Sequence, residues 1–570
     1  MFLKKSTRKK TNRTQLSIVH NYWDSTLKKT RTKTIKTLGY LDELKREYDD
    51  PIAHFEAVAA QMNQEHKKEN SVEVVKIDLN EKIDKDNTNR KNFGYAAFSK
   101  IYHELEIDKF FTNRQRNLNV NYSLNNIMKL MVFSRLIKPC SKKRTFENKD
   151  FYFENSNFSL VDIYRALSDI NKFRDALQLS IYEHIREQYG RNTDIVYYDV
   201  TNYYFEIDEE DDFRRNGPSK EHRKDPIVQM GLLMDNLGIP IAYKLFKGND
   251  TDCTTLVPVL KEIRRNFSLG RLIVVADKGL NTAENIYYNT KRSNGYVFSQ
   301  SVRKANKELK NYVLNENGYE WIGEDYKRKS RLYPRQIEVT EDGKKIKVDI
   351  HEKQVIFYSR DYDKRAKAER AAALKKAKEF IKSPSKYNNA ISYGAAKYIK
   401  NLKIDKDTGE IIDKKAILEF DEKKLKEEEQ FDGYYAIVTS EWKESDDRII
   451  EIYRGLWKIE ESFKITKSDL EARPVYVSRE DRIQSHFLIC FISLVLSRII
   501  QHRLGNKYCV TKIIESLRNV SCSHSNENLY LFDYRDDVTD AIGEVLGIDF
   551  TRKFVKLGEI KKNLGEVKKI

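Results

Sequence analysis

The alternation of hydrophobic and polar residues divides the chain into segments of different kinds. Near the start, residues 15–23 and 31–38 alternate on either side of Asp24-Ser25-Thr26, which predicts a small β-hairpin. Asp50-Pro51 then supplies an N-cap and a first-turn proline for a helix to about Gln64. The stretch from Asn80 to Lys91 has almost no apolar residues, so it predicts the first domain boundary.

From Phe93 to Gly190 the periodicity is helical. Ser123 is predicted to cap one helix, and Ser159-Leu-Val-Asp162 is a capping box that opens another. The basic residues Lys142, Lys143 and Arg144 lie between them. A basic turn between short helices is typical of DNA-binding modules, but the periodicity by itself indicates only a helical bundle.

From Asp194 the pattern changes to strands. Strands are expected at 195–205, 227–234, 239–246 and 272–276, with a helix at about 254–264. Three antiparallel strands, a helix and a buried strand of the parallel type form the opening of a ribonuclease-H-like sheet.

Between about Ser301 and Gln430 this pattern is interrupted. A hairpin around Asp342-Gly343 and a charged helix at 362–381 give this segment a mixed, basic character, which indicates an insertion. Core patterning resumes at Gly433 and continues in a helix from about Ser445. The predicted fold class is therefore α/β, with a ribonuclease-H-like core interrupted by a mixed α/β insertion.

The predicted domains follow these changes of pattern. They are a basic N-terminal arm, hairpin and linker (1–92), a helical, DNA-binding region (93–193), the first part of the core (194–300), the insertion (301–430), the second part of the core (431–505) and a C-terminal helical region (506–570). At 570 residues the chain is too long for one core, in line with a length prior of about three or four domains.

Charge and composition indicate a partner and a compartment. The net charge is +17, and the first 40 residues hold 11 Lys and Arg against the single acid Asp24. A polyanion such as nucleic acid is the expected partner, although a basic arm also serves solubility or membrane-surface attraction. The five cysteines form no C-x-x-C pair, which favours a reducing compartment and no disulfide frame. With no signal-like segment, and with the longest apolar run (487–496) about half a membrane span, the sequence predicts a soluble, cytoplasmic protein without membrane contact.

Three carboxylates stand where a structural role leaves them unexplained. Asp199 lies within a predicted buried strand, Asp277 ends another, and Glu460 follows aromatic residues on a helix. An ionised carboxylate out of water costs several kcal/mol unless it is paired, hydrogen-bonded or bound to a metal. Three such groups therefore suggest a divalent-metal site, and hard oxygen ligands suit Mg²⁺ and phosphoryl transfer. Taken singly, each acid has a plain alternative: a strand-end Asp, a turn Asp or a surface Glu paired with lysines.

Helical spacing selects Glu460 rather than Glu461. On one helix, Tyr453, Trp457, Glu460, Lys464 and Lys467 share a face, and a neighbouring stripe of apolar residues (452, 456, 459 and 463) is the predicted core side. The first face is then expected to look into a cleft, with Lys464 and Lys467 placed to bind phosphate beside a metal ligand. Glu461 is expected to point away from both stripes; the alternative is that Glu461 is the ligand.

These residues resemble a known family. The motifs Asp199-Val-Thr201, Asp277-Lys-Gly279 and Tyr453-x6-Glu460-x6-Lys467 are similar to those of the DDE transposases of bacterial insertion sequences, in the branch with an insertion domain before the catalytic Glu. Glu471-Ala-Arg-Pro-Val-Tyr476 also resembles that branch. The similarity covers roughly residues 194–500.

The resemblance implies a function and its cofactors. It implies an Mg²⁺-dependent transposase and endonuclease in which Asp199, Asp277 and Glu460 hold two metal ions, with Mn²⁺ able to substitute. It further implies that the protein binds the double-stranded DNA of element ends and target and acts as a homodimer in a synaptic complex, associated with the bacterial nucleoid when bound. Tyr453, Arg454, Lys464 and Lys467 would contact DNA, as would Lys142, Lys143 and Arg144.

One position departs from the family pattern. The broader signature has Arg three residues after the Tyr, where this chain has Leu456, so an arginine contact must come from Arg454 or elsewhere. The alternatives are a metal-dependent nuclease without strand transfer, a silent DNA-binding regulator derived from a transposase, and a two-carboxylate glycosidase. The intact triad argues against the regulator, and the basic arm and third acid argue against the glycosidase.

Overall fold

The structure is a computed structural model that describes residues 1–8, 12–24, 29–69, 80, 82, 89–218, 224–267, 269–382, 394–401, 418–525 and 528–569. It contains two compact units, Met1–Asn87 and Thr88–Ile570. The boundary between them lies within the predicted polar stretch. The boundaries expected inside the second unit stay predictions.

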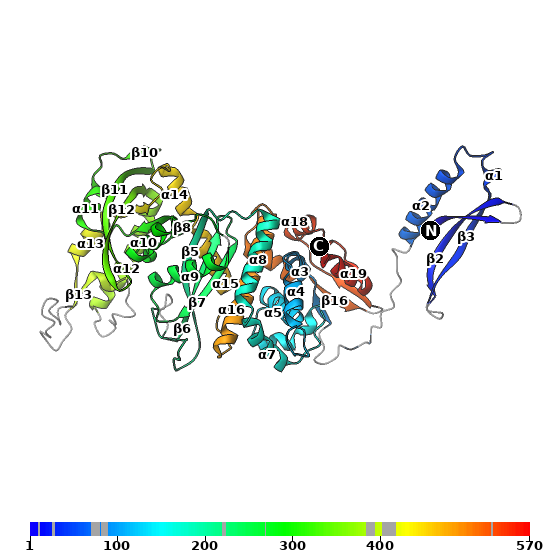
Figure 1. Cartoon of the computed structure of the whole chain (residues 1–570), viewed down its shortest axis with the longest axis horizontal. Coiled ribbons are helices and arrows are strands. Elements are labelled where there is room, and N and C mark those ends of the chain that lie inside the picture. Colours follow the sequence, from blue (N-terminus) through cyan, green and yellow to red (C-terminus); the bar gives the residue numbers. More distant parts are fainter. Residues whose placement is uncertain are drawn as a thin grey trace. The chain divides into compact units, whose positions relative to one another are not determined.

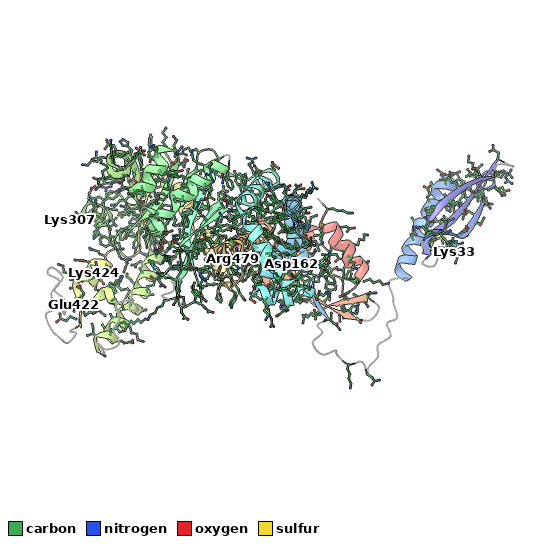
Figure 2. All side chains as sticks on the ribbon, turned by 60° about the horizontal axis from the view of Figure 1, so that its bottom comes forward. Lys33, Asp162, Lys307, Glu422, Lys424 and Arg479 are labelled. Carbon is green, nitrogen blue, oxygen red and sulfur yellow. The ribbon has the colours of Figure 1, made fainter. Side chains whose placement is uncertain are left out.

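The first unit is a three-stranded antiparallel sheet with two helices. Its elements are β1 (Phe2–Arg8), β2 (Arg13–Asp24), β3 (Lys29–Tyr40), α1 (Leu41–Leu44) and α2 (Pro51–Glu69). The predicted hairpin is confirmed as β2 and β3, whereas β1, which pairs with β2, was not expected. The Asp50 carboxylate accepts hydrogen bonds from the Ile52 and Ala53 amides, so the predicted helix start is confirmed, and α2 continues to Glu69. Much of β3 is exposed, including Lys33 (Figure 2).

The second unit begins with a helical region. Its elements are β4 (Arg90–Asn92), α3 (Tyr95–Glu104), α4 (Ile107–Gln115), α5 (Leu124–Ile137), α6 (Lys142–Glu147), η1 (Lys149–Phe151), α7 (Leu160–Asn171) and α8 (Arg174–Tyr189). Ser123 caps α5, and Ser159 with Asp162 forms the predicted capping box of α7. Both predicted helix starts are confirmed.

The helical region packs around one long apolar helix, α16 (Glu480–Arg503). Helices α3, α5 and α7 contact α16, which is orange in Figure 1. By length and composition α16 is the one described helix apolar enough to cross a membrane, but its apolar stretch is entirely buried inside this unit. The apolar run noted in the sequence is therefore a core helix.

A nine-stranded mixed sheet forms the centre of the second unit, in the order β10-β11-β12-β15-β9-β8-β5-β6-β7. Its strands are β5 (Ile195–Tyr204), β6 (Ile227–Asp235), β7 (Pro240–Lys247), β8 (Ile273–Ala276), β9 (Gly295–Gln300), β10 (Glu320–Ile322), β11 (Tyr326–Glu341), β12 (Lys344–Ser359) and β15 (Tyr434–Thr439). Strands β5, β6 and β7 are antiparallel, and β8 and β9 run parallel to β5. The four strands predicted after Asp194 are confirmed.

The segment predicted as an insertion contributes to this same sheet. The long hairpin of β11 and β12 turns at Asp342 and Gly343, both at positive φ, and β12 pairs with β15. The remaining elements of the segment are α11 (Lys307–Leu314), α12 (Arg360–Lys382), η4 (Ala396–Tyr398), β13 (Ile399–Asn401), β14 (Leu418–Phe420) and α13 (Glu422–Glu429). The hairpin and the charged helix are confirmed, but the hairpin extends the central sheet through backbone pairing.

Helices cover both faces of the central sheet. The elements are α9 (Asp252–Asn266), η2 (Lys278–Leu280), α10 (Ala283–Lys291), α14 (Asp446–Arg454) and α15 (Trp457–Ser468). One core lies between the sheet and α9 and α10, and the other lies between the sheet and α14, α15 and α16. The helix expected from Ser445 does begin there, with Ser445 as its N-cap, but it is two helices rather than one.

The C-terminal region is mixed and not helical as predicted. It contains α17 (Val510–Asn519), β16 (Ser521–Ser525), β17 (Leu529–Phe532), α18 (Asp537–Leu546), β18 (Phe554–Lys556) and α19 (Leu557–Val567). The three strands join β4 in a four-stranded sheet, with β16 against β4. Strands of three to five residues carry too little alternation to be recognised, and the pairing of β4 with β16 joins residues more than 400 positions apart.

Candidate active site

The register of β5 and β8, continued by two residues, brings Asp199 and Asp277 opposite each other. Strands β5 and β8 are parallel, with Ile195 opposite Ile273 and Tyr197 opposite Val275. Two residues further on, the same register sets Asp199 opposite Asp277, on strands about 4.8 Å apart. Because Tyr197 and Val275 lie in the core beneath α14, α15 and α16, the strand alternation directs both aspartates to that face.

Asp277 does not have the turn role that a strand-end aspartate often has. It precedes the short helix η2, but its side chain makes no capping hydrogen bond there. Instead its Oδ1 accepts a hydrogen bond from Ser299 Oγ at 2.7 Å and a weaker contact from the Tyr453 hydroxyl at 3.5 Å. Both donors come from other elements, β9 and α14, so the carboxylate is held by a network built across the fold.

Tyr453 is set up as a donor to this carboxylate. Burial raises the pKa of the Tyr453 phenol, the hydrogen bond with Ser299 opposes that rise, and the nearby charges of Asp277 and Glu460 add to it. The phenol therefore keeps its proton at neutral pH. The same pKa effect shows that Tyr453 lies within electrostatic reach of both proposed acids.

Glu460 lies on the first turns of α15, and its side chain is exposed. The helix rests on β5: the Tyr203 hydroxyl and Thr466 Oγ1 are 2.7 Å apart, and Ile459 lies in the core shared with Tyr197. The predicted core stripe is confirmed, since Ile452, Leu456, Ile459 and Phe463 are all at most 6% exposed. Glu460 is thus presented from the same side of the sheet as the two aspartates.

The break between α14 and α15 was not predicted. It falls at Gly455 and Leu456, where the Tyr197 hydroxyl of β5 occupies the space that a Cβ on Gly455 would need. Only glycine allows this close approach of helix and strand. The contact between Gly455 and Tyr197 therefore holds the start of α15, which carries Glu460, close to β5, which carries Asp199.

Glu461 has a structural partner that the sequence did not indicate. Arg498 of α16 donates from Nη1 to Glu461 Oε2 at 2.7 Å and from Nη2 to Ser462 Oγ at 2.6 Å. Arg498 is buried, with 4% of its side chain exposed, so Glu461 neutralises a buried charge. Arg498, which no sequence motif marks, is the residue that anchors α15 to α16.

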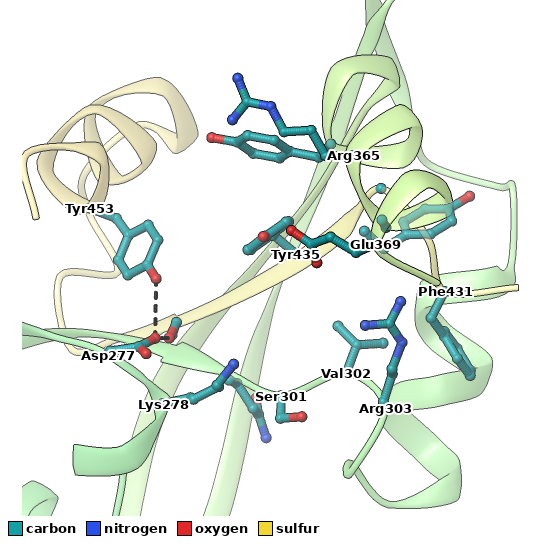
Figure 3. Close-up of a pocket in the computed structure, with 16 residues that line it drawn as sticks. Asp277, Lys278, Ser301, Val302, Arg303, Arg365, Glu369, Phe431, Tyr435 and Tyr453 are labelled. Carbon is teal, nitrogen blue, oxygen red and sulfur yellow. Dashed lines mark hydrogen bonds between the residues drawn. The ribbon is translucent and has the colours of Figure 1, made fainter. Parts of the chain in front are cut away.

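A pocket of about 330 Å³ opens beside Asp277. Asp277, Lys278 and Tyr453 line one side, and Arg303, Arg365 and Glu369 line the other (Figure 3). Ser299 and Tyr435 are also among the lining residues. Arg365 and Glu369 belong to α12, in the segment predicted as an insertion. The segment therefore supplies one wall of the site, a contribution that its sequence pattern did not indicate. Asp199 and Glu460 do not line this pocket.

The donor set suits a divalent metal in chemistry, and the structure assembles it in part. Asp199 on β5 and Asp277 directly after β8 supply two hard carboxylates, and carboxylate oxygens are ligands that Mg²⁺ prefers. Across the described ranges, no three His, Cys, Asp or Glu side chains are gathered closely enough to hold a metal ion. The three carboxylates therefore lie on β5, directly after β8 and on α15, and their assembly around a metal stays a prediction.

The residues expected to contact DNA lie on two parts of the fold. Tyr453, Arg454, Lys464 and Lys467 belong to α14 and α15, and the others begin α6. Arg454 and Lys464 are exposed, Lys467 Nζ lies 5.6 Å from the ring centre of Tyr203, and the Arg454 guanidinium lies 5.6 Å from that of Tyr326. Leu456, which stands where the family pattern has arginine, is buried and offers no contact to DNA.

The basic segment of the helical region differs from its prediction. Ser141 caps α6, so Lys142, Lys143 and Arg144 form the first turn of a helix and not a turn between helices. Lys143 and Arg144 are exposed, but Lys142 is buried against α16, where its amine lies 3.1 Å from His486 Nδ1. The interpretation of this segment as a basic turn is therefore wrong, and α6 packs its first residue inward.

Comparison with known families identifies the chain. The family described as "Transposase DDE domain" matches residues 201–496, more than half of the chain, and "IS1634 family transposase, N-terminal domain" matches residues 3–74. The chain belongs to the DDE transposases. The match includes Asp277 and Glu460 and begins two residues after Asp199. The suspected membership of the insertion-sequence transposases is confirmed, and the protein is a DNA transposase whose family depends on divalent metal ions.

Solved structures of transposases show distant similarity. "Cryo-EM structure of piggyBac transposase synaptic complex with hairpin DNA (SNHP)" is 9% identical, with 83% of this transposase and 84% of that chain covered and a TM-score of 0.37. "Mos1 transposase paired-end complex with left transposon end" is 13% identical, with 30% and 56% covered and a TM-score of 0.14. TM-scores this low do not establish a shared fold. No curated protein matches the transposase.

Proposed function

We propose that Asp199, Asp277 and Glu460 form the catalytic centre with which this transposase cuts and joins DNA. The observation that carries the proposal is the parallel register of β5 and β8, which sets the two aspartates opposite each other on the face covered by the helix of Glu460. The strand order β7-β6-β5-β8-β9 supports assigning this part of the sheet to a ribonuclease-H-like core that the segment 301–430 interrupts.

The chain's own residues supply position and charge. Divalent metal ions held by the three carboxylates, two Mg²⁺ in this proposal, would activate water or a 3′-hydroxyl and stabilise the leaving oxygen. Ser299 and Tyr453 orient Asp277 by donating hydrogen bonds to it. Lys464 and Lys467 extend beyond Glu460 on α15 and would neutralise phosphate charge on the bound strand.

The inserted segment completes the proposed site on the other side. Arg303 and Arg365 offer cations across the pocket from Asp277, and Tyr435 offers an aromatic face. These groups suit the phosphates and bases of a DNA strand at the cut. Double-stranded element ends and target DNA are the proposed substrates, bound by a dimer in the synaptic complex.

Strand transfer distinguishes a transposase from a nuclease that only hydrolyses. With Mg²⁺ or Mn²⁺, the purified protein is expected to cut a duplex carrying the element end and to join its 3′-hydroxyl to a second DNA. With EDTA in place of metal, both products should disappear. The two products are separated on a sequencing gel with a labelled strand. Cleavage without any joined product would support the nuclease instead.

The first unit is expected to contribute non-specific affinity. Removing residues 1–87 takes away a compact unit whose first 40 residues hold 11 Lys and Arg against one Asp. Binding to the element end should weaken, and the slope of log K against log salt should flatten by roughly 0.9 for each DNA phosphate that this unit neutralises in the full-length protein. Gel shifts over a salt series measure both quantities. An unchanged slope would show that this unit does not bind phosphate in the complex.

A further inference from the structure

A second pocket, of about 570 Å³, lies away from the carboxylates, where α6 and the start of α16 meet the loop that follows α15. Its lining is strongly basic: Arg135, Lys142, Arg144 and Arg473 face it, and Glu471 is the single carboxylate among the lining residues. A basic pocket with so little counter-charge is built for an anion.

Lys142 contributes a buried amine that forms no ion pair with any acid in the part of the chain that the structure describes. Its partner is His486 Nδ1 at 3.1 Å, and His486 Nε2 lies 2.9 Å from the Ala472 carbonyl. Because a carbonyl only accepts, Nε2 carries the ring hydrogen, and Nδ1 accepts from the amine. Burial lowers the pKa of His486 well below its usual value, so the imidazole stays neutral and supplies no negative charge.

Arg135 lines the same pocket and also carries an unused donor. Its Nη1 donates to the carbonyls of Leu470 and Glu471, and its Nη2 donates to that of Cys140, which fixes the loop against α5. Its Nε is buried without a hydrogen-bond partner, and only 6% of the residue is exposed. Within the described residues, no carboxylate forms an ion pair with Arg135 or Lys142. A buried donor left unpaired is costly unless a ligand takes it up.

The pocket is connected to the proposed catalytic centre by two elements. The Arg473 guanidinium lies 5.4 Å from the ring centre of Tyr204, at the end of β5 and five residues beyond Asp199. Five strand residues span about 16 Å, and the part of α15 that follows Glu460 and ends at Ser468 spans about 12 Å. One DNA strand carries a phosphate about every 3.4 Å along the helix axis, so this separation corresponds to about five nucleotides.

We propose that this pocket binds a backbone phosphate of the DNA strand about five nucleotides from the cut, with Lys142, Arg135 and Arg473 as its donors. Tyr476, which is 64% exposed at the rim, offers a surface to the adjoining sugar or base. The inference rests on the proposed function, because it takes DNA lying across the carboxylates as the ligand.

Burial and the neighbouring charge of Arg135 lower the pKa of Lys142 to about 7. The groups that share this environment are Arg135 on α5, His486 and Cys490 on α16, Cys140 before α6, and Glu471 and Arg473 on the loop. A bound phosphate favours the charged amine, so binding takes up a proton. Affinity should therefore fall as the pH rises above about 7.

The test removes the charge first from single DNA phosphates and then from the side chain of Lys142. Single methylphosphonates are placed along one strand of an end-containing duplex, and binding to the full-length protein is measured in EDTA, so that no cutting occurs. The wild type should lose roughly tenfold or more in affinity at a position about five nucleotides from the cut. Lys142→Met should bind the unmodified duplex more weakly, show no further loss at that position, and lose the pH dependence above 7. The matched control is Lys143→Met, a change at the exposed neighbouring residue. It should keep both the loss of affinity at that position and the pH dependence above 7.

The outcomes separate the possibilities. If Lys142→Met and Lys143→Met keep the same sensitivity at every position, the pocket does not bind the backbone. If phosphate ion stabilises the wild type against heat more than chloride does, and no methylphosphonate position responds, the pocket takes free anions and the assignment to DNA is overturned. Should Lys142→Met fail to fold, Arg473→Gln is measured in the same way, and a retained sensitivity at the position found for the wild type overturns the proposal. Failure of the carboxylate assignment would appear separately, as cutting by variants of Asp199 or Asp277 in Mg²⁺.

Discussion

Replacing Asp199 or Asp277 with asparagine is expected to abolish DNA cleavage and strand transfer while leaving binding to the element end largely intact. The amide keeps the shape of the side chain but loses the negative charge that a divalent metal requires. Loss of one such ligand removes several kcal/mol of transition-state stabilisation, about a thousandfold in rate. Cleavage assays beside gel shifts measure the two effects separately.

The same strand offers a matched control. Asp194 is exposed immediately before β5, five residues before Asp199, and Asp194→Asn removes an equal charge far from the site. It should cut at close to the wild-type rate. An Asp199→Asn or Asp277→Asn protein that still cuts at that rate would remove the residue from the catalytic centre.

Local signals were enough to predict the elements that carry the aspartates. Asp199 lies within the predicted strand β5, and Asp277 directly follows β8, whose short, continuous apolar run is typical of a buried parallel strand. Capping residues such as Ser123, Ser159 and Ser445 marked helix starts that the structure confirms. In each case the deciding interaction lies within a few residues of the position itself.

The features that the sequence did not predict depend on contacts between distant segments. The break at Gly455 is imposed by Tyr197, more than 250 positions earlier, because the strand and the helix approach too closely for a side chain. Lys142 was predicted to belong to a basic turn, yet it lies in the first turn of α6, where its amine contacts His486 of α16. Ser299 could have been predicted as a partner of Asp277. Each directly follows a paired residue of the adjacent parallel strands β8 and β9, so their side chains point to the same face of the sheet.

The expected contrast between the adjacent acids Glu460 and Glu461 tests the position of the third ligand. Glu460→Gln should lose nearly all Mg²⁺-dependent cleavage, by the same loss of charge as the aspartate variants. Glu461→Gln should retain activity within about tenfold, because successive helix residues are about 100° apart and Glu461 is engaged with Arg498 on the side of α16.

Stability makes the two variants distinguishable in a second way. Glu461→Gln keeps a hydrogen-bond acceptor for Arg498 but leaves that buried guanidinium without a counter-charge, at a cost of about 1 to 3 kcal/mol. Its melting temperature should therefore fall, whereas that of Glu460→Gln, whose side chain is exposed, should change little. Thermal melts and cleavage of an end-containing duplex are measured on both proteins. If Glu460→Gln still cuts, and Glu461→Gln is inactive but as stable as the wild type, then Glu461 is the metal ligand. The pairing of Glu461 with Arg498 would then serve catalysis and not stability.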